Sequence, residues 1–236
     1  MKSLFIVLLQ LQSLMVLFAC APNGSMIDRS NVMTDTVEKS VAHQQSPLPM
    51  PMRLAFMSGH VSAGITLYHA GETEMASSHL LHPVSETHVD ERAGLYGIGF
   101  THAIFESVSL ALEADAPKTL VMPLLARTKE HMEMLTKNAG GDPISIIRFL
   151  LETSVEEYSI GVQDGKLTDL GEYQDAFGFV VVAAEHASRL PETSNNQLFE
   201  KVSSLRQIWL RGPLPVVTPT PSDELALAVK AILSQI

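Results

Sequence analysis

Hydrophobic residues recur at intervals of three and four along most of the chain from Arg53 onward, which is the spacing of one face of an α-helix. Glycine and proline divide this stretch into segments, because both residue types favour helix ends. Two short runs, 178–182 and 214–217, look like strands, but the first lies inside a helical pattern. The predicted helices cover about 54–68, 72–81, 86–95, 102–112, 119–138, 142–162, 172–189, 195–210 and 222–235. We therefore predict an all-α fold of about eight helices in an irregular antiparallel bundle.

Small and large residues follow a regular order in the first two predicted helices. Gly64, Leu67, Gly71, Ala76 and Leu80 have the spacing of a tetratricopeptide-type helix hairpin, in which small residues let two helices approach closely. No second copy follows at the period of about 34 residues that such repeats require. We expect a single hairpin with small residues at its crossing.

The N-terminus has the layout of an export signal. Residues 1–19 begin with one lysine and continue as a mainly apolar run. The run ends at residues 17–20 in Leu-Phe-Ala-Cys, which resembles a bacterial lipoprotein signal with its small residue before the lipid-bearing cysteine. The resemblance implies cleavage before Cys20 and acyl chains such as palmitate on this residue, which hold a protein on a bilayer. An uncleaved membrane anchor and a plain secretory signal are the alternatives.

The residue after the cysteine bears on the compartment. Ala21 stands where an aspartate would favour retention in the inner membrane of a Gram-negative cell. We therefore expect a bacterial envelope protein, anchored to the outer membrane and facing the periplasm rather than anchored to the inner membrane.

The segment that follows has no sustained apolar period and closes on three prolines that alternate with leucine and methionine. This composition is typical of a flexible tether with a stiffer end. The predicted organisation is an export signal over 1–19, a lipid-bearing cysteine and tether over 20–52, and a helical domain over 53–236.

The composition of the 236 residues excludes several classes of protein. A single cysteine can form neither an intramolecular disulfide nor a thiolate zinc site. Sixteen basic residues against twenty-six acidic ones, with no basic run, argue against nucleic acid as a partner. The hydrophobic content of 46% comes in large part from the apolar export signal. After this signal, no run is both apolar and long enough to span a bilayer.

Catalytic motifs are not recognisable. The chain has no Gly-x-Ser-x-Gly, no phosphate-binding glycine loop and no dinucleotide fingerprint. Ser85 could be paired with His82 and His88 as in a hydrolase, but a serine at this place is better explained as a helix cap. The sequence favours a protein that is not an enzyme, without deciding the question.

Six of the nine histidines gather in the first third of the predicted helical domain. His79 and His82 are three residues apart, so they share a face of a helix. Glu86 and His88 follow just after a proline turn, and His60 can reach the same group across the hairpin. Imidazole and carboxylate groups suit zinc, iron or copper. We predict a metal site formed by His79, His82 and His88, with Glu86 and His60 as additional ligands.

A plainer interpretation of the histidines stays open. His69 and His102 lie near predicted helix ends, where a histidine commonly caps the helix or hydrogen-bonds to it. The same explanation can apply to the other four.

Carboxylates gather in the stretch 150–179. Glu156 and Glu157 lie near the end of one predicted helix, and Glu172 and Asp175 lie near the start of the next. An antiparallel pairing brings the two ends together, and helical bundles bind iron through glutamates from several helices. We predict a secondary metal site at Glu156, Glu157 and Glu172.

Eight positions in this stretch also carry a family resemblance: Leu150, Leu151, Tyr158, Val162, Asp164, Gly165, Glu172 and Tyr173. Their order resembles the helical periplasmic segment of some high-affinity iron permeases. In those proteins the segment lies outside the membrane and is thought to handle metal before transport. The Arg-Glu-x2-Glu motif of the permease is absent here, so the resemblance implies a stand-alone accessory domain.

Two functions remain open at this point. The first is an envelope lipoprotein whose helical domain binds a transition-metal ion (iron, copper or zinc) beside a metal-transport or envelope protein partner. The second is a non-catalytic helical interaction module, tethered to the membrane through Cys20, whose histidines do not converge.

Overall fold

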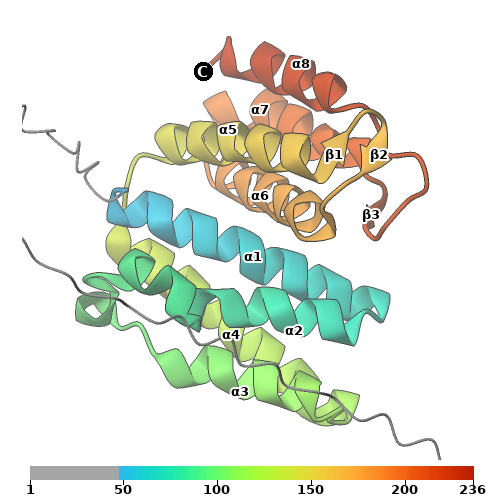
Figure 1. Cartoon of the computed structure of the whole chain (residues 1–236). Coiled ribbons are helices and arrows are strands. Elements are labelled where there is room, and N and C mark those ends of the chain that lie inside the picture. Colours follow the sequence, from blue (N-terminus) through green and yellow to red (C-terminus); the bar gives the residue numbers. More distant parts are fainter. Residues whose placement is uncertain (1–47) are drawn as a thin grey trace, which may run out of the picture. The chain divides into compact units, whose positions relative to one another are not determined.

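The computed structural model describes residues 48–236, except for the side chains of 86–88 and 192–196, and this part of the chain is almost entirely helical (Figure 1). Its α-helices are α1 (Met50–Ala70), α2 (Thr73–Leu81), α3 (His102–Glu113), α4 (Lys118–Ala139), α5 (Pro143–Gly161), α6 (Leu170–Ser188), α7 (Glu192–Ser204) and α8 (Ser222–Leu233). The predicted all-α fold is confirmed. None of these helices has both the length and the apolar character needed to cross a bilayer.

Short connecting elements complete the described part of the chain. They are the 3₁₀-helices η1 (His82–Val84), η2 (Glu86–Arg92), η3 (Leu95–Ile98) and η4 (Leu205–Ile208) and the strands β1 (Val162–Gln163), β2 (Lys166–Leu167) and β3 (Leu210–Pro213). Strands β1 and β2 pair antiparallel in the turn between α5 and α6, with Val162 opposite Leu167.

Two predicted helices differ from the observed ones. The segment 86–95 forms 3₁₀-helix η2 only to Arg92 instead of a continuous α-helix, and Gly94, whose φ is +79°, separates η2 from η3. The segment 195–210 is α-helical only to Ser204 and tightens into η4 before β3. The apolar run 178–182 lies within α6, as its helical surroundings indicated.

The hydrophobic core has two parts, and α1 contributes to both. One part joins α5, α6, α7 and α8 and includes Ala55 of α1. The other joins α1, α2, α3 and α4 and includes Leu54 and Met57 of α1. Figure 1 shows α1 running between the group α5–α8 and the group formed by α2, α3 and α4. Helix α1 therefore joins the two halves of the domain.

Helices α1 and α6 touch backbone to backbone. A Cβ atom on Gly178 of α6 would lie 2.1 Å from the carbonyl oxygen of Gly59 in α1. A Cβ atom on Gly59 would lie 2.1 Å from a ring carbon of Phe179. No side chain larger than hydrogen fits at either position without moving the helices apart.

Helices α1 and α2 form the predicted hairpin with small residues at its crossing. A Cβ atom on Gly64 would lie 2.8 Å from Leu80 Cγ and 3.0 Å from the carbonyl oxygen of Ala76. The chain turns between the helices at Gly71, whose φ is +93°. Glycine is favoured in this left-handed conformation because it has no Cβ to clash.

Helix α1 begins at Met50, three residues before the predicted domain boundary at Arg53. Pro51 lies in the first turn, where a missing N–H costs no helical hydrogen bond, so the proline-rich end of the predicted tether belongs partly to the helix. Arg53 fixes this end of α1, since its Nη1 donates to the carbonyl oxygens of Glu91 at 2.6 Å and Ala93 at 2.8 Å.

The crossing of α1 and α6 leads to a stability prediction. We expect Gly178→Ala to lower the free energy of unfolding by about 3 kcal/mol, because the added methyl group overlaps the α1 backbone. The loss should appear even though alanine favours a helix over glycine by about 1 kcal/mol. Gly97→Ala is the matched control, since a Cβ there meets no atom within 4 Å. Urea unfolding measures both, and a Gly178→Ala protein as stable as Gly97→Ala would contradict the close contact.

Candidate metal centre

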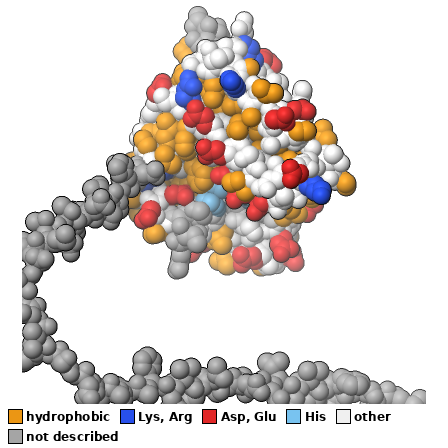
Figure 2. All heavy atoms as spheres, turned by 45° about the horizontal axis from the view of Figure 1, so that its top comes forward, with side chains coloured by type: hydrophobic (Ala, Val, Ile, Leu, Met, Phe, Trp, Pro, Cys, Tyr) orange, Lys and Arg blue, Asp and Glu red, His pale blue; other side chains and the backbone are white. Residues whose placement is uncertain are grey.

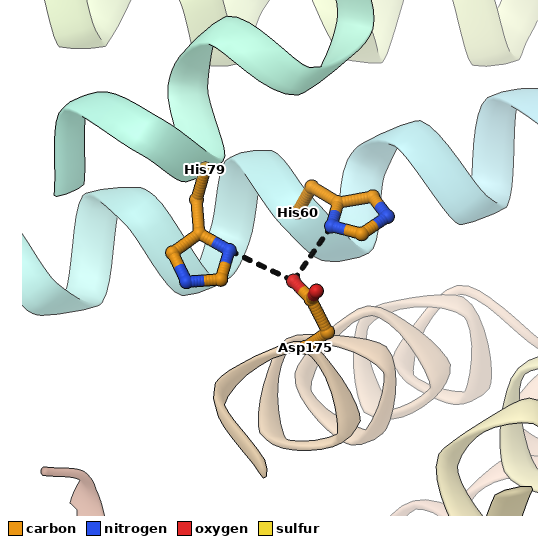
Figure 3. Close-up of side chains that lie close together, drawn as sticks. All are labelled: His60, His79 and Asp175. Atoms are coloured by element: carbon orange, nitrogen blue, oxygen red, sulfur yellow. Dashed lines mark hydrogen bonds and ion pairs between the residues drawn. The ribbon is translucent and has the colours of Figure 1, made fainter. Parts of the chain in front are cut away.

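Three side chains from three helices converge in the interior of the domain (Figure 3). His60 of α1 and His79 of α2 both direct Nδ1 at Oδ1 of Asp175 of α6, at 2.6 Å and 2.8 Å. The side chains are 4%, 8% and 12% exposed in that order, so water screens their interaction weakly. One carboxylate oxygen thus accepts a hydrogen bond from each imidazole.

The glycine crossings explain why these groups meet. His60 follows Gly59, and Asp175 precedes Gly178 by one helical turn, so the close contact of α1 with α6 brings the two side chains together. A Cβ atom on Gly64 would lie 3.2 Å from the Cβ of His79, so the crossing of α1 with α2 sets the position of the second histidine.

The hydrogen bonds indicate the charge state of the cluster. His79 directs Nδ1 at Asp175 and Nε2 at Oε1 of Gln174, 2.9 Å away, so both ring nitrogens face acceptors and the imidazolium form is favoured. Burial opposes this charge, but the hydrogen bond and charge of Asp175 together with Gln174 raise the pKa of His79 above its usual value. Gln174 is itself oriented by its amide, which donates to Met75 Sδ.

Asp175 is held as a carboxylate. Burial disfavours the ionised form, but the hydrogen bonds from His60 and His79 outweigh burial and hold the pKa of Asp175 well below its usual range.

His60 differs from His79 in its second ring nitrogen. Nε2 of His60 is buried and has no hydrogen-bond partner among the described residues. A buried nitrogen without a partner is uncommon and calls for a physical explanation.

A third histidine lies against the cluster. The ring of His82 stacks on the ring of His60, with centroids 3.4 Å apart and planes 14° from parallel, and Phe56 meets both rings edge-on. Nε2 of His82 lies 3.9 Å from a carboxylate oxygen of Glu91. Three of the predicted ligands, His60, His79 and His82, are therefore neighbours.

The cluster is reached from the surface through a shallow opening between α2 and α6. Met75, Ser78 and Gly171 line this opening together with His79 and Asp175. The space-filling view in Figure 2 shows histidine reaching the surface beside acidic and hydrophobic side chains. A small solute can therefore approach the buried carboxylate without unfolding the domain.

The predicted carboxylate group lies between α5 and α6. Glu157 and Glu172 hydrogen-bond to each other, which requires a proton between them. Burial, the Glu172 hydrogen bond and charge, and the charge of Asp175 raise the pKa of Glu157 to about 8. Glu156, by contrast, is exposed on α5. The pair Glu157–Glu172 therefore retains a proton at neutral pH and adds to the negative field around His79.

Some predicted site residues lie outside the described part of the chain. These are Cys20, which precedes residue 48, and the side chains of Glu86 and His88. The proposed roles of all three remain predictions. His102 begins α3 and bonds to the carbonyl oxygen of Val84 at 3.1 Å, as expected for a histidine near a helix end.

Asp175 is the site residue that sequence reasoning did not connect with the histidines. It was grouped with the nearby glutamates, but it lies 115 positions from its partner His60, and no short spacing relates the two. A signal was nevertheless present, because Gln174 and Asp175 interrupt an otherwise apolar face of α6. A polar pair on a buried face requires polar partners from another helix.

Comparison with known proteins finds a match for the C-terminal part of the chain. Residues 141–236, which contain α5 to α8, match the family described as the iron permease-associated 4-helix bundle domain. This match supports the resemblance seen in 150–179 and covers less than half of the chain. Asp175, Glu157 and Glu172 lie inside the matched region, whereas His60 and His79 precede it. No curated protein and no solved structure matches the chain.

The buried charges of the cluster lead to a prediction on pH. Because the pKa of Asp175 is lowered, the stability it contributes is present above the unfolded value near 4 and is lost as the pH falls. Because the pKa of His79 is raised, its contribution is present below about 6.5 and is lost as the pH rises through the folded value. We expect Asp175→Asn to lower the free energy of unfolding by about 3 kcal/mol between pH 4 and 6.5. The loss should be smaller below pH 4 and above pH 6.5.

Urea unfolding between pH 3 and pH 9 measures this effect. Asp164→Asn is the control, since Asp164 is exposed in the turn after α5 and asparagine tolerates its φ of +51°. Parallel stability curves for wild type and Asp175→Asn would exclude an ionised carboxylate at this position.

Proposed function

We propose that this protein binds a transition-metal ion through His60, His79 and Asp175 and serves as an accessory to iron handling. The observation that carries the proposal is convergence. One ligand atom from each of these residues lies within 4.8 Å of the others, although the three belong to three different helices. Two imidazoles and one carboxylate are a donor set that suits ferrous iron, zinc or copper.

The chemistry of the cluster fits an ion. The protons on the two Nδ1 atoms lie between nitrogen and a carboxylate oxygen, so an ion can substitute for them and release protons. The Glu157–Glu172 pair retains one proton, and the remaining negative charge, which acts on His79 from Glu172, favours a cation.

Iron is the first ion to test. The bundle α5–α8 matches a domain named for its association with iron permeases, and it contributes Asp175 and the glutamate pair. His82 and His88 are proposed as further ligands, and the ring of His82 lies against that of His60. A permease or another metal-transport protein of the envelope is the proposed partner. Copper and zinc remain alternatives that the same donors accommodate.

The proposed place of action is the bacterial envelope. A cysteine after a small residue at the end of an apolar run favours lipidation, and Ala21 favours the outer membrane over the inner membrane. The anchor would keep the domain on the membrane surface, where ions pass to a transporter.

Metal binding is tested by elemental analysis of the full-length protein in detergent, equilibrated anaerobically with Fe(II) and separately with Co(II), whose absorption reports coordination. We expect about one ion per chain in the wild type, with proton release on binding. In His60→Asn/His79→Asn the ion should be lost, since asparagine preserves an N–H near the position of Nδ1 but removes the ligand nitrogens.

His69→Asn is the matched control, because His69 is an exposed histidine in the last turn of α1. Urea unfolding of each variant separates loss of binding from loss of fold. Equal metal content in the wild type and the double variant would end the proposal and favour the interaction module. His82→Asn and His88→Asn, measured in parallel, determine whether these residues also ligate the ion.

Lipidation is tested by expressing the full-length protein in a Gram-negative host fed with an alkyne fatty acid. We expect labelling of the wild type and none of Cys20→Ser, because the chain has no other cysteine that could carry the label. Membrane fractionation should place the wild type with the outer membrane. An unlabelled wild-type protein would contradict the proposed anchor.

A further inference from the structure

A cavity lies between α1, α4 and α6, away from the histidine–aspartate cluster. Its volume is about 190 Å³, and its wall includes Val61 and Ile65 of α1, Met132 of α4 and Val182 of α6. A second cavity of about 430 Å³ adjoins it at the end of α4 and shares His186 and Arg189 of α6 with it. Because the two cavities share part of their wall, we refer to them together as the groove, whose lining mixes apolar, polar and charged side chains.

His186 is the unusual residue of this groove. Its side chain lines both cavities, the residue is only 7% exposed, and its ring makes no hydrogen bond to the described residues. Burial, assisted by the charge of Arg189, lowers the pKa of His186 to about 4. At neutral pH the ring is uncharged and presents one donor and one acceptor. An imidazole on the wall of a cavity can hydrogen-bond to a molecule bound there.

Two cations stand at the rim of the groove. Lys129 Nζ lies 3.6 Å from one oxygen of Glu185, and Arg189 Nη2 lies 4.0 Å from the other. These separations exceed a direct hydrogen bond, and both basic side chains are about half exposed, so they can turn toward a ligand. Glu133 is the other acidic residue in the wall. The wall of the first cavity thus carries two basic and two acidic side chains, on a chain with a net charge of −10.

We propose that this groove binds a small organic carboxylate with a short apolar body. The apolar part would lie on Val61, Ile65 and Val182, and the carboxylate would bridge Lys129 and Arg189 in place of their contacts with Glu185. The N–H of His186 would donate to the ligand. Arginine and lysine beside an apolar surface are the usual recognition elements for such molecules.

This site is separate from the proposed metal centre. His186 lies eleven residues beyond Asp175 on α6, which corresponds to about 16 Å along a helix. None of the residues that line the groove belongs to the histidine–aspartate cluster. The proposal therefore stands or fails independently of metal binding.

Benzoate is the probe, and the experiment is calorimetric titration of the full-length protein in detergent, with nuclear magnetic resonance of the histidine rings. We expect saturable binding of benzoate and a shift of the His186 ring signals. Benzamide, which has the same shape without the charge, should bind at least about tenfold more weakly.

Variants that remove a charge from the groove should weaken benzoate binding in one case and strengthen it in another. Lys129→Gln/Arg189→Gln should weaken benzoate binding by about tenfold or more, and Glu185→Gln should strengthen it because both cations lose their competitor. Lys166→Gln/Arg211→Gln is the matched control, since these exposed cations lie outside the groove. His60→Asn/His79→Asn should leave benzoate binding unchanged. Absence of saturable binding, or equal affinity in the wild type and the Lys129/Arg189 variant, would overturn the proposal.

Discussion

The backbones of α1 and α6 lie in close contact where Gly59 and Gly178 face each other without side chains. This contact sets the separation of the two helices more tightly than any pair of packed side chains could. It joins the two parts of the hydrophobic core, because α1 belongs to both. It also brings His60 within hydrogen-bonding distance of Asp175. The polar cluster is thus a consequence of how the apolar helices pack.

The candidate metal centre is divided between two structural units. The bundle α5–α8, which matches the iron permease-associated domain, carries Asp175 and the Glu157–Glu172 pair. The hairpin α1–α2 precedes the matched region and carries the histidines. The bundle alone offers carboxylates, which prefer hard cations, whereas the hairpin adds nitrogen donors that favour transition metals. The set of possible metal ligands therefore requires both the hairpin and the bundle.

The sequence predicts the fold well and the site only in part. Helical periodicity, the turn at Gly71 and the small residues Gly64 and Ala76 were sufficient to predict the α1–α2 hairpin, because each is a local signal. Local signals could not show that Asp175 faces His60, since only the packing of α1 on α6 relates them. They also suggested α-helix after Ser85, where the chain instead forms 3₁₀-helix as far as Arg92. The error and the omission both concern positions decided by tertiary contacts.

Asp175 uses a single oxygen to accept from both histidines, and this has a mechanical consequence. This oxygen connects α6 to both α1 and α2. A change that displaces it therefore breaks the hydrogen bond to His60 of α1 and the one to His79 of α2 together. Binding of an ion at this site and packing of the α1–α2 hairpin against α6 would therefore be thermodynamically linked. A partner that binds the α1–α2 hairpin at the surface would change the affinity of the histidine–aspartate cluster for an ion. An ion bound at the cluster would change the affinity of the hairpin for that partner by the same factor.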